Sequence, residues 1–145
     1  MTLLELIIAC GILLILSSAA LPIAKYSIIR QKEAELRRDV REMRDAIDRY
    51  KDAADRNQIR VEIGSEGYPP DLETLVKGVQ LGASSDRKIR FLRKIPVDPI
   101  TGRAEWGLRA VQDDPDSTSW GGKNVFDVYS KSTAAALDGT KYSDW

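Results

Sequence analysis

Histidine is absent from this sequence of 145 residues, and Cys10 is its single cysteine. Without histidine, the commonest general base and metal ligand is missing, so no Ser-His-Asp or Cys-His catalytic site can be built. One cysteine cannot form an intrachain disulfide, and one thiol without histidine makes no zinc site. Net charge is also zero, with 22 basic and 22 acidic residues, so we expect no bulk attraction to nucleic acid. We predict that the protein is not an enzyme.

Charged side chains are nearly missing from the N-terminal segment as well. Residues 6–24 carry none, and Glu5 is the only charged side chain before Lys25. The segment offers about 20 residues dominated by apolar side chains, enough for a helix of roughly 30 Å that could span a bilayer. A signal peptide would carry basic residues at its start and would have no use for an acid there. Residues 1–24 therefore predict a single transmembrane helix.

Glu5 is the most informative residue in this segment. A carboxylate without a partner inside an apolar membrane helix costs on the order of 3 kcal/mol. The nearest cation in sequence is the α-amino group of Met1, either in the same chain or in a neighbouring copy that is staggered along a common axis. Alternatively, Glu5 lies at the membrane surface and stays hydrated.

Residues 23–56 predict a continuation of the same helix in amphipathic form. Apolar side chains recur at helical spacing, which indicates one buried stripe: Leu36, Val40, Met43, Ile47, Tyr50 and Ala54. Acidic residues precede basic ones by four positions on the other faces, a spacing that favours weak ion pairs: Glu33–Arg37, Asp45–Arg49 and Asp52–Arg56. The stripe should pack on the C-terminal region, so only lipid or copies of the chain can cover the apolar first half.

Three segments follow from this pattern. Residues 1–24 form the membrane or filament-core half of the helix, residues 25–57 form its amphipathic half, and residues 58–145 form a globular head. Gly11 and Pro22 lie within the apolar half. Because proline removes one helical hydrogen bond, we predict a kink or a melted segment that ends near Pro22. The alternative is a proline that the helix tolerates at the membrane edge.

The head region alternates between loops and short regular elements. Residues 71–77 predict a short helix that ends at Gly78, and residues 104–111 and 124–130 favour strands. Trp145 should dock back on the head. We expect an α+β fold, in which a long N-terminal helix packs on a small antiparallel sheet of two or three strands.

The N-terminal residues Met1-Thr2-Leu3-Leu4-Glu5-Leu6-Ile7 resemble the signature of type IV pilins. The resemblance implies a short basic leader that a prepilin peptidase removes before it N-methylates the new N-terminus. Met1 stands where the family usually has phenylalanine, so the alternative that Met1 is an initiator remains open. The resemblance also implies that Glu5 pairs with the N-terminal amine of the adjacent subunit during assembly.

The head resembles the major pseudopilin of type II secretion systems. The similar elements are Tyr68-Pro69, Pro96-x-Asp98-Pro99, Phe126-Asp-Val-Tyr-Ser130 and an Asp-Gly turn before the final tryptophan. Adhesive pilins typically have a C-terminal cysteine pair, which this chain lacks. The resemblance implies a periplasmic pseudopilus built on the inner membrane, with an assembly ATPase, a platform protein and minor pseudopilins as partners. A surface type IV pilus for adhesion, motility or DNA uptake is the alternative.

The same resemblance implies calcium in the last loop, with Asp138 and Asp144 as candidate ligands. Calcium prefers oxygen ligands, but this tail is shorter than the family's acidic loop and places Lys141 between the two aspartates. A simple turn at Asp138-Gly139 is the alternative.

Two further alternatives belong to other classes of function. One is a membrane-anchored enzyme, and the other is a binding module that uses Trp106 and Trp120, although both tryptophans are more typical of a core.

Overall fold

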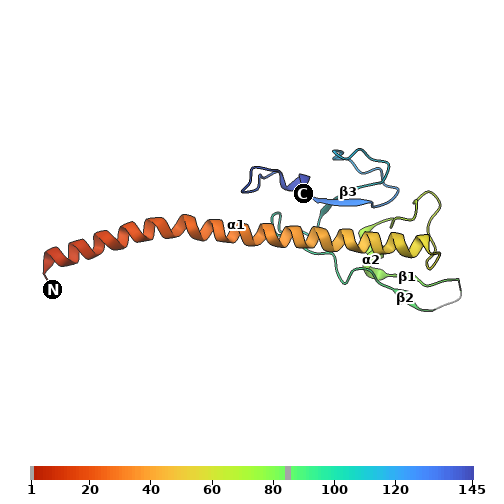
Figure 1. Cartoon of the computed structure of the whole chain (residues 1–145), viewed down its shortest axis with the longest axis horizontal. Helices are drawn as coiled ribbons and strands as arrows, with labels where there is room; N and C mark the ends of the chain where they lie inside the picture. The colour runs from red at the N-terminus through yellow and green to blue at the C-terminus, as the bar shows by residue number, and fades with distance from the viewer. Residues whose placement is uncertain (1, 84–85) are drawn as a thin grey trace.

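The fold is α+β, with one long helix and a small head (Figure 1). A computed structural model of the chain describes residues 2–83 and 86–145. The helices are α1 (Leu3–Asp55), α2 (Leu72–Lys77) and the 3-10 helix η1 (Tyr142–Asp144). The strands are β1 (Val79–Gln80), β2 (Lys88–Ile89), β3 (Trp106–Arg109) and β4 (Asp127–Ser130).

Helix α1 begins at a capped residue and continues without a break for 53 residues. Thr2 is the N-cap, and its Oγ1 accepts a hydrogen bond of 3.2 Å from the backbone N–H of Glu5. Pro22 lies inside the helix, which curves gently along its first half in Figure 1. The predicted melted segment near Pro22 is not found in this single chain. Proline removes one hydrogen bond, whereas melting a turn in an apolar setting would leave several backbone groups without partners.

The second half of α1 buries the predicted stripe, and all six of its residues belong to the hydrophobic core. None of the three predicted i,i+4 ion pairs forms among the described residues, and Glu33 and Arg49 make other contacts instead. Glu33 accepts hydrogen bonds from the tail of the head, and Arg49 donates to backbone carbonyls. These charges prefer tertiary partners, because an exposed pair along a helix is worth only a few tenths of a kcal/mol.

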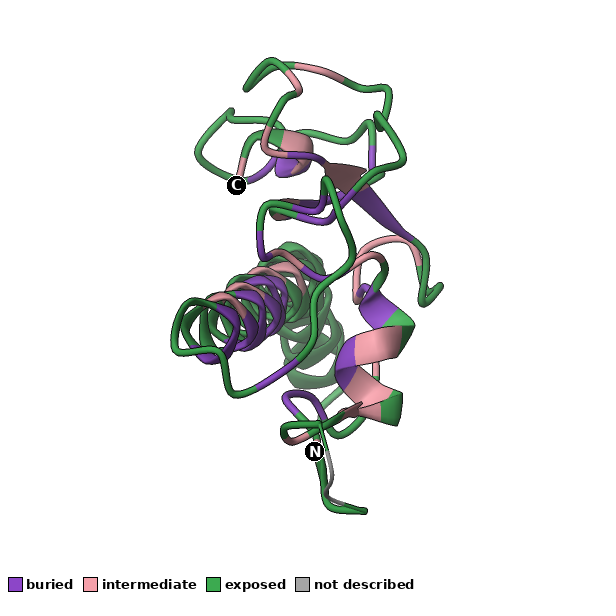
Figure 2. Cartoon of the chain, turned by 90° about the vertical axis from the view of Figure 1, so that its right-hand side faces the viewer, coloured by how far each residue is buried: buried purple, intermediate pink, exposed green. Residues whose placement is uncertain are grey.

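The head contains two separate two-stranded antiparallel sheets rather than the single sheet that was expected. In the first sheet Val79 pairs with Ile89, and in the second Trp106 pairs with Ser130. The pair β1–β2 lies on one side of α1 and β3 lies on the other (Figure 1). Figure 2, which looks along α1, shows the β1–β2 hairpin and the loops around β3–β4 at opposite ends of the head. The second sheet packs on α1 through β4, whereas Val79 and Ile89 of the first sheet pack against the hydrophobic core.

Helix α2 forms where the sequence predicts it. Asp71 caps its N-terminus by accepting a 2.6 Å hydrogen bond from the N–H of Thr74. Gly78 follows its last residue with φ of 81°, and a β-carbon there would approach the carbonyl oxygen of Ile89 too closely. Glycine at this position thus lets the chain turn directly from α2 into the first sheet.

Candidate assembly surface

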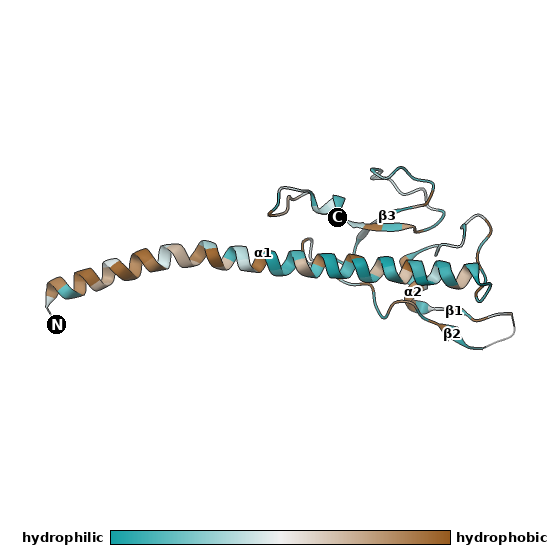
Figure 3. Ribbon diagram, in the orientation of Figure 1, coloured by the Kyte–Doolittle hydropathy of each residue, from teal (hydrophilic) through white to brown (hydrophobic). Residues whose placement is uncertain are grey.

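The apolar half of α1 is left uncovered by the rest of the chain (Figure 3). Leu14 and Ile15 are 72% and 71% exposed, and the most apolar stretch of the helix has no buried residue. By length and composition this helix could span a membrane, which agrees with the predicted single-pass anchor. A bare apolar surface of this size requires lipid or a protein partner.

Glu5 lies in the exposed first turn of this half. Within the described residues its carboxylate has no ion-pair or hydrogen-bond partner, although the partial positive charge of a helix N-terminus favours an acid there. Met1 lies outside the described residues, so the predicted pairing of Glu5 with the Met1 amine stays a prediction. An unpaired acid beside a bare apolar surface is free to accept a cation from another molecule.

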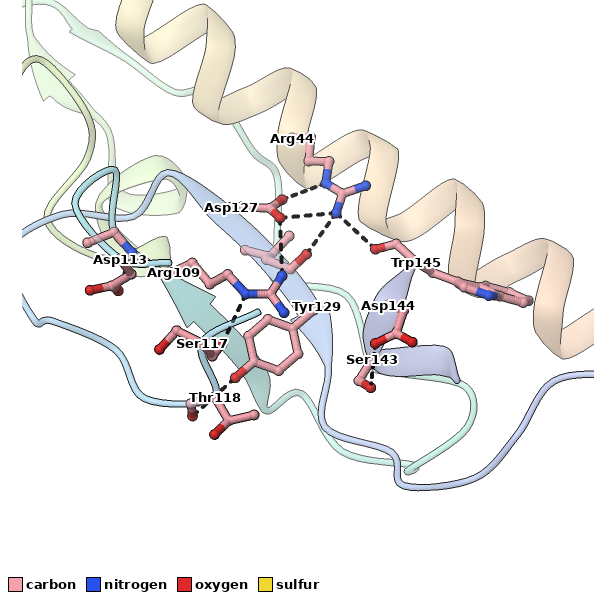
Figure 4. Close-up of polar contacts among 12 residues, drawn as sticks. Arg44, Arg109, Asp113, Ser117, Thr118, Asp127, Tyr129, Ser143, Asp144 and Trp145 are labelled. Atoms are coloured by element: carbon pink, nitrogen blue, oxygen red, sulfur yellow. Dashed lines mark hydrogen bonds and ion pairs between the residues drawn. The ribbon is translucent and has the colours of Figure 1, made fainter. Parts of the chain in front are cut away.

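Arg44 joins the other half of α1 to the head (Figure 4). Its Nε donates to Oδ1 of Asp127 at 2.6 Å, and its Nη2 lies 3.3 Å from Oδ2 of the same carboxylate. The same Nη2 donates to the carbonyl oxygens of Val128, at 3.3 Å, and of Trp145, at 2.9 Å. One guanidinium thus connects the helix, strand β4 and the C-terminal residue, a geometry that lysine cannot reproduce.

Asp127 also contacts a second arginine. Nη1 of Arg109 lies 3.5 Å from Oδ2 of Asp127, and its guanidinium stacks 4.1 Å from the centre of the Tyr129 ring. Nε of Arg109 donates to the carbonyl of Ser117, and the Tyr129 hydroxyl donates to that of Thr118 (Figure 4). The Phe-Asp-Val-Tyr-Ser element therefore organises both the contact with α1 and the loop that connects β3 to β4.

The Pro-x-Asp-Pro element has a structural role too. The carboxylate of Asp98 is fully buried, and its Oδ1 accepts hydrogen bonds from the N–H groups of Ile100 and Thr101. Its Oδ2 accepts a 2.5 Å hydrogen bond from the hydroxyl of Ser130 at the end of β4. Buried carboxylates need such partners. Two of the four sequence elements that carry the resemblance are thus bonded to each other in this fold.

Asp39 is a second buried acid, only 5% exposed on the face of α1 that carries the core. Burial raises the pKa of its carboxyl, and the nearby Glu35 and Glu42 add to that rise. Arg38 lowers the pKa in part, because its Nη2 lies 3.5 Å from Oδ1 of Asp39. Ionisation of Asp39 is therefore less favourable in the folded chain than in the unfolded chain.

Trp145 packs against the hydrophobic core, as predicted, and the C-terminal tail also docks on α1. The Tyr142 hydroxyl and the N–H of Leu137 donate to Glu33 Oε1, at 3.0 and 2.8 Å. The Trp145 ring packs edge-on against Tyr142, and the guanidinium of Arg37 lies 3.9 Å from the ring centre. The tail thereby closes the end of the core nearest the apolar half.

The residues proposed for calcium are occupied by other contacts. Oδ1 of Asp138 accepts bonds from the hydroxyl and the N–H of Thr140, which lower the pKa of the carboxyl, and Oδ2 faces Arg37 at 3.7 Å. Asp144 accepts only from Ser143. No group of three acidic, histidine or cysteine side chains converges anywhere in the described part of the chain. Calcium takes six or more oxygen ligands, and these two carboxylates do not supply such a set by themselves, so calcium in the last loop stays a prediction.

The two tryptophans considered for a binding module differ in their surroundings. Trp106 is buried and donates from Nε1 to the carbonyl of Pro96, so it belongs to the core. Trp120 is 40% exposed and donates to the carbonyl of Asn124, which corrects the expectation that it is a core residue. The polar loop around Trp120 does not supply enough apolar neighbours to bury it.

A scan against protein-family models, a search of curated proteins and a search of solved structures each found no match for this chain. The functional argument therefore depends on the chain's own surfaces.

Proposed function

We propose that this chain is a structural subunit that polymerises into a helical filament, with the apolar half of α1 in the filament core and the head outside. The observation that carries the proposal is the continuity of α1, whose first half is bare and whose second half is buried by the head. Before assembly the bare half lies in lipid. After assembly it packs against copies of itself.

Within that class we favour the major pseudopilin of a type II secretion system. The filament would stand in the periplasm on the inner membrane and would push secreted proteins toward an outer-membrane channel. The elements around Asp98 and Asp127 support this choice, because both belong to the resemblance, and they are bonded to each other while Asp127 also holds the head on Arg44 of α1. A prepilin peptidase, an assembly ATPase, a platform protein and minor pseudopilins are the implied partners.

Substitution of Glu5 tests the assembly step. We expect Glu5→Val to insert into membranes as well as the original chain but to be left out of filaments, because it cannot accept the amine of a neighbouring copy. Membrane fractionation measures insertion, and copurification with tagged filaments measures incorporation. Glu5→Asp, which keeps the charge, is the matched control. Normal incorporation of the valine variant would contradict the pairing.

Cryo-electron microscopy of sheared and periplasmic fractions tests the filament itself. Short periplasmic filaments whose density fits this chain, or long ones only on overexpression, are the expected result. Long surface filaments at native expression would favour the alternative, a type IV pilus. Absence of any filament from this chain would contradict the whole proposal.

A further inference from the structure

Opposite charges lie on opposite sides of the head. Residues 90–93 leave strand β2 and border a groove against α1, on the side of the helix where β1 and β2 lie (Figure 1). We call this the basic groove, because three arginines and one acid line it together with two apolar residues: Glu42, Arg49, Arg90, Phe91, Leu92 and Arg93. The guanidiniums of Arg90 and Arg93 are exposed and have no ion-pair partner within residues 2–83 and 86–145.

Residues 113–117 form the complementary surface, which we call the acidic loop. It lies in the connection between β3 and β4, at the end of the head opposite the β1–β2 hairpin (Figure 2). The carboxylates of Asp114 and Asp116 are exposed and likewise have no ion-pair partner in the described part of the chain. Both surfaces thus carry charge that the single subunit leaves unpaired.

The acidic loop is held in a fixed shape. Oδ2 of Asp113 accepts hydrogen bonds from the N–H groups of Ala110 and Gly121, at 2.7 and 3.0 Å. The N–H of Ser117 donates to the carbonyl of Asp114, and the carbonyl of Ser117 accepts from Arg109. Because these bonds already order the loop, docking it on a partner costs little conformational entropy.

We propose that the basic groove of one copy binds the acidic loop of the next copy, so that the heads are joined around the filament. Two different patches on opposite sides of a subunit produce a heterologous contact, which propagates into rings or helical polymers. A two-fold dimer that paired like patches would place equal charges together. The inference rests on the proposed filament and assigns the contact that sets the register of its heads.

The charge contact between heads and the apolar half of α1 contribute differently to assembly. The apolar half of the helix can bury a large surface, but lipid tails and neighbouring helices are similarly apolar surroundings for it. This half therefore does little to fix the position of one subunit relative to the next. Complementary charges add specificity and guide association more than they add affinity. High salt should therefore slow filament growth without dissolving finished filaments.

Charge reversal in the full-length chain tests the inference. Arg90→Glu with Arg93→Glu, or Asp114→Lys with Asp116→Lys, should each reduce filament yield at least tenfold. All four substitutions in one chain should restore it, because the contact re-forms with its charges exchanged. Arg90→Lys with Arg93→Lys, which keeps the charge, should assemble normally.

A second compensation controls for net charge. Glu62→Lys with Glu105→Lys restores the net charge of the Arg90→Glu, Arg93→Glu chain at exposed positions outside both surfaces, and it should not restore filaments. Rescue by this distant pair would overturn the inference, as would normal assembly of either charge-reversed chain. If the original chain itself fails to assemble, the proposed function falls instead.

Cross-linking gives a readout that does not depend on yield. In a Cys10→Ala background, chains with Arg93→Cys and chains with Asp116→Cys are co-expressed and oxidised after filaments are sheared from cells. A disulfide-linked dimer that requires both variants supports the contact. Intact filaments without that dimer overturn it.

Discussion

At the residue scale, the buried acids Asp39 and Asp98 differ in how well their neighbours satisfy them. Asp98 accepts hydrogen bonds from two backbone N–H groups and from the hydroxyl of Ser130. Asp39 has Arg38 as its ion-pair partner at 3.5 Å, and two further acids lie near enough to raise its pKa. The first arrangement supports the fold, whereas the second opposes the ionised form of the side chain.

Replacement of Asp39 by asparagine should therefore stabilise the chain at neutral pH. The folded carboxyl has a raised pKa, so the original chain loses stability as the pH rises from the ordinary pKa through the folded one. The asparagine variant should have the higher Tm at pH 7, and the difference should vanish below both pKa values. Thermal unfolding in detergent, followed by near-ultraviolet circular dichroism between pH 3 and 7, measures this. An equal Tm for both chains at pH 7 would refute the argument.

Neither acid's role is visible in the sequence. Asp39 lies one position before Val40 of the predicted stripe. Its charged neighbours in the sequence are typical of a solvated helix face. Ser130 is 32 residues from Asp98, and nothing in their local sequence indicates a bond. Local patterns predict which residues are apolar and which are polar, but the partner of a buried polar group depends on how distant segments pack.

At the element scale, the elements with strong local signals form as predicted. The core stripe of α1 follows helical spacing, and α2 has an aspartate cap and a terminal glycine. The sheets are less well predicted, since the strands β1 and β2 contain only two residues each. Their pairing follows the turn that leads from α2 into β1 at Gly78 rather than a strand pattern.

Gly107 of β3 provides a test of the second sheet. It pairs with Tyr129 across the sheet, and a β-carbon at this position would overlap the tyrosine ring. Gly107→Ala should therefore lower the free energy of unfolding by about 1–3 kcal/mol. Denaturant unfolding in detergent micelles measures the loss. Tyr129→Ala removes the obstructing ring, so the double variant should lose less than the sum of the single losses.

At the scale of the whole molecule, Arg44 connects helix α1 to strand β4 and to the C-terminal tail. It is 83 residues from Asp127 and 101 from Trp145, and its position among many charged residues on the helix gave no sign of this role. The helical layout, the bare apolar half and the exposed Glu5 were predictable from the sequence. The contacts that hold the head at a fixed place on the helix were not.

Arg44→Ala should destabilise the docked head by about 2–3 kcal/mol, because it removes several charge-assisted hydrogen bonds. Arg44→Lys should recover only part of the loss, since an ammonium cannot contact the carboxylate and two carbonyls in the same way. Denaturant unfolding followed by tryptophan fluorescence reports the change. Full stability of the lysine variant would show that charge alone matters there.

The bare apolar half of α1 has a thermodynamic consequence for a subunit that leaves a membrane to join a polymer. Lipid tails and packed apolar helices offer this surface nearly the same environment, so the transfer between them involves little net hydrophobic free energy. A small difference makes the exchange reversible: subunits can return to the bilayer intact when the polymer shortens. In the proposed filament, an external source of work would then set the direction of the exchange, and the same pool of chains could serve repeated cycles of extension and retraction.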